Sequence, residues 1–449
     1  MYLQPKRRTA YIYWVYFALV TVLAVYLRFW FVASIPTEQL YDFNTYQEIA
    51  ANIFKYHSHS LWGQPVAWQG MGYSTALGIF YILMGNAQVQ TAQLFNCLLS
   101  TLSLPLMFLV FRKLSSHFGV VLGAYTIAAL LPNHIAYNNV VGTEVFITFL
   151  FLIILVLQLY EFDNRFRYPL LGIFIGLAAL TKPFFLAYPV VLALCHWLHS
   201  KDLRRTALML ISTSLLMAAV VSPWTIHNYK NFNSFIPVSY NSGYVLFINN
   251  NDQNVNGMWM PLENVPASPQ LKKDIKRELN RNQDNVKLAP GLDKVLKPAA
   301  KQWIGENPGD FMKLGLLRLK QTFFSGAQDI SAWAMNDFQS NPGQKESPRF
   351  KRNLNFFYGA ADILVYILCS AGILYLLLNL GSIFKSLFSR DLTLSNAILV
   401  PSINTAFFLA VYFVFEGQPR YNFPLLFLFA ITLGIIMHKT SQGLQRSES

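Results

Sequence analysis

The sequence predicts an all-α protein that crosses a membrane about ten times. Of the 449 residues, 54% are hydrophobic and only 13% are Asp, Glu, Lys or Arg, whereas a soluble domain has about 25% charged residues. Long uncharged apolar runs also follow one another along the chain. A run of about 18 such residues is enough to cross the hydrocarbon of a bilayer. These observations exclude a string of soluble domains.

Ten apolar runs are predicted to form the spans. Their ranges are 11–35, 87–111, 118–136, 144–160, 168–181, 183–199, 206–224, 356–380, 393–415 and 422–438. Gly172 and Gly176 allow close approach of helices, and Lys182 with Pro183 marks the turn between two short runs. The apolar stretch 73–84 would be an eleventh span if it inserted deeply.

The basic residues predict the orientation. With a cytoplasmic N-terminus, the cytoplasmic segments hold 14 Lys and Arg residues and the short outer segments hold 4. The other 17 of the 35 lie in 225–352, and long loops cross a membrane largely regardless of charge. We therefore predict a protein of the cytoplasmic membrane with both termini in the cytoplasm. The net charge of +13 then reflects topology, and we expect no nucleic-acid partner.

The chain is predicted to have three parts. Residues 1–224 form an N-terminal transmembrane module with a first outer loop at 36–86, residues 225–352 form a mixed outer loop region, and residues 353–449 add the C-terminal transmembrane helices.

Each outer piece is predicted to contain helices. In the first outer loop, Asn44 is a candidate N-cap. It precedes an amphipathic helix that would lie in the membrane interface, with apolar residues Tyr46, Ile49, Ala50, Ile53 and Phe54. The second piece has helical stretches at 271–285 and 311–324, with Asn-, Pro- and Gly-rich loops elsewhere.

Acidic residues near the membrane are few, and two are candidate catalytic groups. Asp42 follows the first span and Glu144 opens the fourth, both at the outer interface. A carboxylate there can act as a general base on a hydroxyl. The alternative is a purely structural role, because an acid is favourable at a helix N-terminus.

Four basic residues also lie near the ends of outer apolar segments: Arg28, Lys182, Arg318 and Arg420. Each one alone is explained by its charged group reaching the lipid headgroups. Together they favour an anionic ligand such as a phosphate, which Arg binds through two hydrogen bonds.

Cofactor signals are weak. His57 and His59 lie two residues apart without a third ligand nearby, and Cys97, Cys195 and Cys369 have no metal-type spacing. No nucleotide-binding GxxxxGK[ST], HExxH or GxSxG motif occurs. We expect no cofactor and no metal; a divalent ion is the less favoured alternative.

Five segments together resemble a known superfamily. They are Tyr41-Asp42-Phe43-Asn44-Thr45-Tyr46; Gly70-Met71-Gly72-Tyr73, similar to a "PGYP" segment; Gly142-Thr143-Glu144; residues 172–183 followed by 222–228, similar to "PWxxRN"; and residues 416–421, similar to "E-x-RY". Residues 306–318 match a further stretch of the large outer loop. In this order and spacing, the chain resembles the GT-C superfamily of integral membrane glycosyltransferases, and more narrowly the bacterial relatives of the aminoarabinose lipid A transferase and the protein O-mannosyltransferases.

The resemblance implies transfer of a sugar from a polyprenyl-phosphate donor, outside the cytoplasmic membrane and with inversion. The acceptor would be a glycolipid, a wall polymer or a protein. By position, Asp42 would be the general base and Glu144 a second acid that orients a substrate. Arg420 would bind the donor phosphate, with Lys182, Arg318 and His227 as weaker candidates. Tyr46, Tyr73 and Tyr421 adjoin these motifs and are expected to line the donor and acceptor pocket.

The chain departs from the superfamily pattern at two places. His227 stands where Arg is common, so the contact to phosphate is expected either to differ or to weaken with pH. Asp42 lacks the adjacent second acid with which metal-dependent relatives hold an ion, which favours neutralisation of the leaving phosphate by Arg and Lys.

Two other function classes fit the membrane topology. A lipid transporter would place charges near the midplane and often carries inverted repeats, whereas here they gather at one interface and no repeat is evident. A structural protein with an outer binding region would leave Asp42 and Glu144 as helix-start residues only.

Overall fold

The protein is a multi-pass helical membrane protein. The computed structural model describes residues 7–160, 164–336 and 348–447. Its long helices are α1 (Arg7–Ser34), α4 (Val89–Leu114), α10 (Leu203–Phe232), α16 (Pro348–Phe388), α17 (Asn396–Val414) and α18 (Leu426–Ser447). Sheet structure in the described residues is limited to the antiparallel pair β1 (Ser60–Leu61) and β2 (Gln64–Pro65). The predicted helical fold class is confirmed.

Shorter helices complete the bundle. They are α5 (Phe118–Leu130), α6 (Pro132–Ala136), α7 (Thr143–Leu159), α8 (Asn164–Thr181) and α9 (Tyr188–Ser200). The 3-10 segments among them are η1 (Tyr137–Asn139), η2 (Pro183–Ala187) and η6 (Pro419–Leu425). Several of these elements begin with a proline. The backbone N–H of a residue in the first turn has no partner within the helix, so the N–H that proline lacks is not missed there.

Seven helical stretches of the described chain are long and apolar enough to cross a membrane, or eight if the pair Phe118–Leu130 and Pro132–Asn139, bent by 45°, is one span. Two further predicted spans, 144–160 and 168–181, correspond to the short apolar helices Thr143–Leu159 and Phe166–Thr181. Gly72–Met84 is also short and apolar. The count of ten spans therefore stays a prediction.

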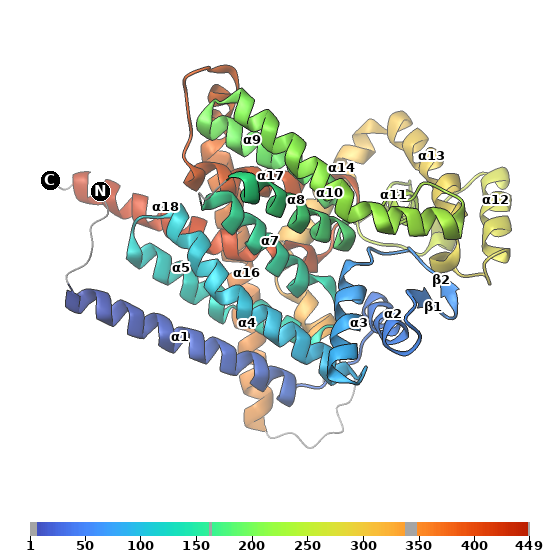
Figure 1. Ribbon diagram of the computed structural model, residues 1–449, viewed down its shortest axis with the longest axis horizontal. Coiled ribbons are helices and arrows are strands. Elements are labelled where there is room, and N and C mark those ends of the chain that lie inside the picture. Colours follow the sequence, from blue (N-terminus) through green and yellow to red (C-terminus); the bar gives the residue numbers. More distant parts are fainter. Residues whose placement is uncertain (1–6, 161–163, 337–347, 448–449) are drawn as a thin grey trace.

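The elements outside the spans gather at one end of the bundle (Figure 1). They include α2 (Asp42–Tyr56), α3 (Gly72–Met84), α11 (Ser242–Asn249), α12 (Pro269–Asn280), α13 (Gly291–Glu306) and α14 (Pro308–Phe323), with η3 (Leu262–Asn264), η4 (Val286–Leu288) and the π-helical turn η5 (Ile330–Ala334). The start of α1 and the end of α18 lie at the opposite end. Because α10 and α16 run across residues 225 and 353, the predicted three-part division does not coincide with element ends.

Helix α2 begins earlier than its predicted cap. Its first residue is Asp42, and the preceding Tyr41 has a positive φ of 49° and makes no side-chain cap. Asn44 lies within the first turn, so its assignment as the N-cap was wrong. The reason is local: the backbone N–H of Thr45 already donates to Tyr41 O, which leaves Asn44 inside the helix.

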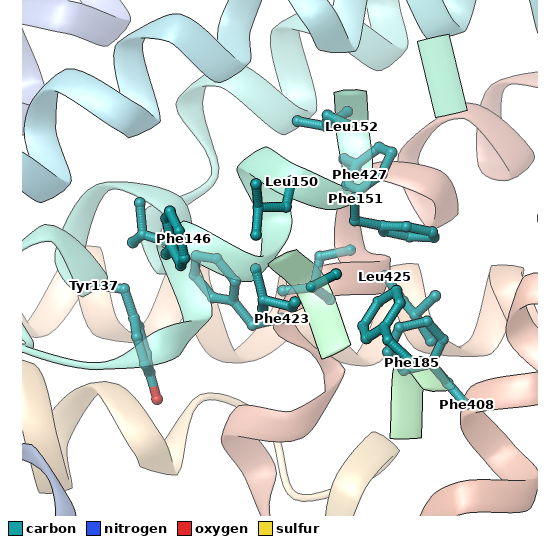
Figure 2. Close-up of a cluster of buried hydrophobic side chains, with 14 of the residues drawn as sticks. Tyr137, Phe146, Leu150, Phe151, Leu152, Phe185, Phe408, Phe423, Leu425 and Phe427 are labelled. Atoms are coloured by element: carbon teal, nitrogen blue, oxygen red, sulfur yellow. The ribbon is translucent and has the colours of Figure 1, made fainter. Parts of the chain in front are cut away.

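Aromatic packing holds α7 in the centre of the bundle. The Phe151 ring contacts Phe185, Phe408 and Phe427, with centroid distances of 6.1, 5.7 and 6.0 Å, and Figure 2 shows this cluster. Inside a membrane, such close packing replaces the hydrophobic driving force between helices. The cluster therefore fixes α7, and with it the position of Glu144 at the start of α7.

Glycines allow the loop before α3 to contact the end of α8. A Cβ on Gly70 would lie 2.4 Å from Leu180 O and 2.5 Å from Thr181 O. Gly72 is equally close to Thr181. Gly172 and Gly176 likewise seat α8 on α10, as predicted, because a Cβ there would clash with Leu216 and Val220. Two of the sequence segments in the resemblance are thus in direct backbone contact.

The contact at Gly70 predicts a stability effect. We expect Gly70→Ala to destabilise the protein by about 1–3 kcal/mol, because the added methyl meets two backbone oxygens that cannot move aside. Gly119→Ala is the matched control, since a Cβ at Gly119 has nothing within 4 Å. Thermal unfolding in detergent measures both. Equal melting temperatures for the two variants would contradict this account of the loop.

Candidate active site

Three sequence segments bring charged groups together. Asp42 lies in the first turn of α2, Glu144 in the first turn of α7, and Arg420 at the start of η6. Arg420 Nη2 lies 3.2 Å from Asp42 Oδ2, and Arg420 Nε lies 3.9 Å from Glu144 Oε1. One guanidinium therefore lies between two carboxylates that are far apart in sequence.

The two acids differ in access. The Glu144 side chain is only 5% exposed, whereas the Asp42 side chain is 36% exposed. Glu144 Oε2 is buried without a hydrogen-bond partner among the described residues. The Asp42 carboxylate is therefore accessible from outside the protein, whereas the Glu144 carboxylate is enclosed by it. Helix-dipole stabilisation accounts for both acids locally, but it does not explain why they converge on one arginine.

Aromatic rings surround the Arg420 guanidinium. Its Cζ lies 4.9 Å from the centre of the Phe43 ring, 5.6 Å from Tyr421 and 6.0 Å from Trp333. Such rings stabilise a cation most when water is excluded. The charge of Arg420 is thereby stabilised within the site.

Lys182 is a further cation of the site, and its ammonium contacts an aromatic ring. Its Nζ lies 5.6 Å from the Tyr421 ring, and the carboxylates of Glu144, Asp42 and Glu416 lie close enough to influence its charge. Among the described residues, none forms a hydrogen bond or ion pair with this ammonium. Lys182 is consequently better placed than Arg420 to bind an added anion, since two carboxylates already engage Arg420.

The Tyr421 hydroxyl is hydrogen-bonded to a neighbouring carboxylate. Its hydroxyl donates to Glu416 Oε2 at 2.7 Å, and Gln418 Nε2 donates to Glu416 Oε1 at 2.6 Å. Burial raises the pKa of Glu416 above its usual range. These bonds fix the loop that carries Arg420.

Tyr46 and Tyr73 support the site from behind. Both are buried, and their rings meet edge to face with a centroid distance of 5.6 Å. The Tyr73 hydroxyl donates to Asn96 Oδ1 at 3.2 Å, and burial raises the pKa of Tyr46. Their place in a substrate pocket stays a prediction, since the structure gives them packing contacts.

Arg318 is engaged elsewhere. Its side chain is fully buried, and its Nη1 and Nη2 donate to Phe413 O at 2.7 Å, Asn249 O at 2.5 Å and Asn250 Oδ1 at 2.7 Å. These bonds join α14 to α11 and α17. The prediction of Arg318 as a phosphate contact has no geometric support, because protein oxygens occupy its fork. Arg28 is similarly held by Ser100 Oγ, Ala24 O and Ala129 O.

His227 lines a separate cavity beside α2. It stacks on Trp224 with a centroid distance of 4.8 Å, and His59 meets the same indole at 4.7 Å. The cavity has a volume of about 670 Å³ and is bordered by Glu48 and Trp62. The structure therefore does not bring His227 to Asp42 and Arg420. The His at position 227, where Arg is common, therefore contributes to a neighbouring cavity.

Comparison with known proteins gives the fold. No family model matches the chain, and no curated protein matches it by sequence. Two solved structures of the archaeal oligosaccharyltransferase of Archaeoglobus fulgidus align with it, one with Zn and sulfate and one with an inhibitory peptide and a dolichol-phosphate. They align with TM-scores of 0.51 and 0.53, at 14% identity, over 95% and 98% of this chain. The chain has the GT-C fold. It spans about half the length of these enzymes, 49% and 52%.

The GT-C fold prompts a test for a metal, because one aligned structure holds Zn. In this chain, the Arg420 guanidinium lies between the Asp42 and Glu144 carboxylates. It already supplies the positive charge that a metal ion would bring to these carboxylates. The described residues contain no group of three His, Cys, Asp or Glu suited to a metal ion. The site residues therefore do not fit a resident divalent ion.

Three site residues escaped the sequence analysis. Lys287 in η4 donates to Thr45 Oγ1 on α2, and burial lowers its pKa while Asp42 and Glu48 oppose that effect. Trp333 covers Arg420 from η5, and Asp329 lies beside Tyr137 and Glu144. No motif or periodicity distinguishes them within the long outer loop, so only folding reveals them.

Asp329 predicts a pH-dependent stability. Burial raises its pKa from 3.8 to about 6, although the neighbouring Tyr137 hydroxyl and the backbone of Asp329 and Ile330 act in the opposite direction. Because the folded pKa is above the unfolded one, folding favours the protonated form. Stability from Asp329 is then complete below about pH 4 and falls as pH rises through about 6.

We expect Asp329→Asn to stabilise the protein on the order of 2–3 kcal/mol at pH 8 and to have little effect at pH 4. Melting temperatures over this pH range measure the difference. A variant that is less stable than wild type at pH 8 would show that the charged form is paired, contrary to this account.

Proposed function

We propose that the chain transfers a sugar from a polyprenyl-phosphate donor to an acceptor hydroxyl, with inversion, at the outer face of the cytoplasmic membrane. The observation that carries the proposal is the 3.2 Å pair of Asp42 and Arg420, with Glu144 and Lys182 beside it, in a GT-C fold. Under this proposal, the acceptor is a glycolipid, a wall polymer or a protein, and both termini are cytoplasmic.

The charged groups have distinct roles in the proposed step. The acceptor oxygen attacks the anomeric carbon while Asp42 takes its proton. The bond from that carbon to the phosphate oxygen breaks, and the polyprenyl phosphate leaves with the electron pair. Lys182 compensates the leaving charge, since phosphate leaves readily once its charge is neutralised.

The Asp42–Arg420 pair has a consequence for the order of events. While Arg420 Nη2 holds Asp42 Oδ2 at 3.2 Å, that oxygen is not free to meet an acceptor hydroxyl. A donor phosphate arriving at Lys182 offers Arg420 a second anion. Arg420 then turns toward the phosphate and frees Asp42 to accept the proton. Donor binding would thus activate the base.

The cavity beside α2 offers room for sugar units. Glu48 on its border lies six residues after Asp42, which is about 9 Å along a helix. Amides from Asn52 and Asn231 and the half-exposed Trp62 border it as well. Aromatic faces and amide groups suit a polyhydroxylated ligand. The volume of about 670 Å³ supports a substrate with one or more sugars.

A lipid transporter is the second candidate. It would use the same polyprenyl-phosphate lipid without breaking a covalent bond. The convergence of acids and bases at one end of the bundle, rather than at its middle, favours the transferase.

The proposal is tested by sugar transfer with purified protein in nanodiscs. A panel of radiolabelled polyprenyl-phosphate sugars is supplied with a membrane extract as acceptor, in the presence of EDTA. We expect label in a new product. NMR should show that the anomeric configuration of the product is inverted relative to the donor. Donor binding without transfer from any member of the panel would count against the transferase, and transfer abolished by EDTA would contradict the metal-independent mechanism.

A further inference from the structure

A second cavity lies at the other end of α10. It has a volume of about 370 Å³ and is bordered by Arg167, Tyr168, His196, His199 and Arg205. Arg205 stands 22 residues before His227 on the same helix, which corresponds to about 33 Å. This is about the thickness of bilayer hydrocarbon. The two cavities therefore lie at opposite membrane faces.

The cavity contains a buried guanidinium, that of Arg167, which forms no ion pair with any described residue. Arg167 is only 9% exposed, and its Nε has no hydrogen-bond partner in the described part of the chain. The described residues that border the cavity include no Asp or Glu. A buried guanidinium without an anion is unfavourable, so the cavity favours a negative group.

Other polar groups of the cavity are equally incomplete. The Tyr168 hydroxyl is buried without a partner among the described residues. His199 Nδ1 bonds Leu394 O at 2.9 Å, and His196 Nδ1 bonds Thr206 Oγ1 at 2.7 Å. Neither Nε2 bonds another described residue. Arg205 is exposed and has one partner, Asp202, at 3.3 Å. Two guanidinium groups and a hydroxyl match the oxygens of a phosphate.

The helices that border the cavity also carry exposed apolar side chains close in sequence to the arginines. Phe166, Leu203 and Leu208 are 65%, 69% and 56% exposed, next in sequence to the arginines. A soluble phosphate has no use for this surface, whereas the acyl chains of a lipid do. The neighbouring Lys201, which donates to Ser386 O, adds to a basic face of the kind that attracts anionic lipids.

We propose that this cavity binds the phosphodiester headgroup of an anionic phospholipid from the leaflet opposite the active site. The headgroup lies between Arg167 and Arg205, and the acyl chains lie along Phe166 and Leu203. The bound lipid joins α8, α9 and α10 at this face and stabilises the bundle. The inference does not depend on the transferase proposal.

The test uses the full chain, purified and depleted of lipid in detergent. Phosphatidylglycerol, phosphatidylcholine and inorganic phosphate are titrated separately, with melting temperature and native mass spectrometry as readouts. We expect phosphatidylglycerol to raise the melting temperature and to stay bound, with phosphatidylcholine at least tenfold weaker. Arg167→Gln should lower the affinity for phosphatidylglycerol about 10–100-fold, as loss of a charged hydrogen bond does.

Two variants control the test. Arg205→Gln removes an exposed cavity arginine and should also weaken the lipid, even if Arg167→Gln fails to fold. Arg204→Gln removes an arginine that is also exposed but lies outside the cavity, and it should leave binding unchanged. Equal effects of the two phospholipids, or equal effects of Arg204→Gln and Arg205→Gln, would overturn the proposal. Full stabilisation by inorganic phosphate alone would show a free-anion site and overturn the lipid assignment.

Discussion

Asp42→Asn is expected to lower turnover roughly 10²–10⁴-fold, the usual contribution of a general base. The amide keeps the size of the carboxylate but cannot accept a proton from the acceptor. Donor affinity should change much less, because Lys182 and Arg420 remain. Single-turnover transfer and equilibrium binding of the labelled donor measure the two effects separately.

Asp310→Asn is the control for that prediction. Asp310 is an exposed acid in the first turn of α14, so it has the same helix-start position without the site. Turnover of this variant should equal wild type. If Asp42→Asn also retained full turnover, Asp42 would be a helix-start residue only, and the assignment of the base would be wrong.

Lys182→Met is expected to weaken donor binding about 10–100-fold, as the loss of one charged hydrogen bond does. Its ammonium has no hydrogen-bond or ion-pair partner in the described protein, so the donor phosphate alone loses such a contact. Lys182→Arg should restore part of the affinity by returning the charge. Both are measured by titration with a polyprenyl-phosphate sugar and with polyprenyl phosphate.

Lys301→Met supplies the comparison for a lost surface lysine, because Lys301 is exposed on α13. We expect no change in its donor affinity. A Lys182→Met protein that binds polyprenyl phosphate as tightly as wild type would mean that the leaving charge is met elsewhere, with Lys287 the next candidate.

Much of the fold was predictable because the membrane imposes it. Backbone polar groups must be paired in hydrocarbon, so uncharged apolar runs become helices. The helices at 72–84 and 308–323 agree with the stretches expected there. The span count was less predictable, because α7 and α8 are shorter than a bilayer crossing and are surrounded by other helices.

Site residues were predictable from the sequence only where charged residues are rare. Asp42, Glu144 and Arg420 stood out because charged residues are scarce at the ends of apolar segments, and the structure brings these three together. Arg318 was equally conspicuous, but its charge is used to bind backbone oxygens. Burial, which sequence does not state, separates the two roles. Lys287, Asp329 and Trp333 reach the site from a long loop whose path no local pattern determines.

The central claim is that this chain breaks the bond between sugar and phosphate rather than moving the intact lipid. Proteoliposomes containing wild type or Asp42→Asn, loaded with one labelled polyprenyl-phosphate sugar and an acceptor, allow transfer and translocation to be measured on the same sample. The account predicts label in the acceptor and release of polyprenyl phosphate with wild type only. Movement of intact donor across the bilayer, equal for both proteins and without product, would contradict it.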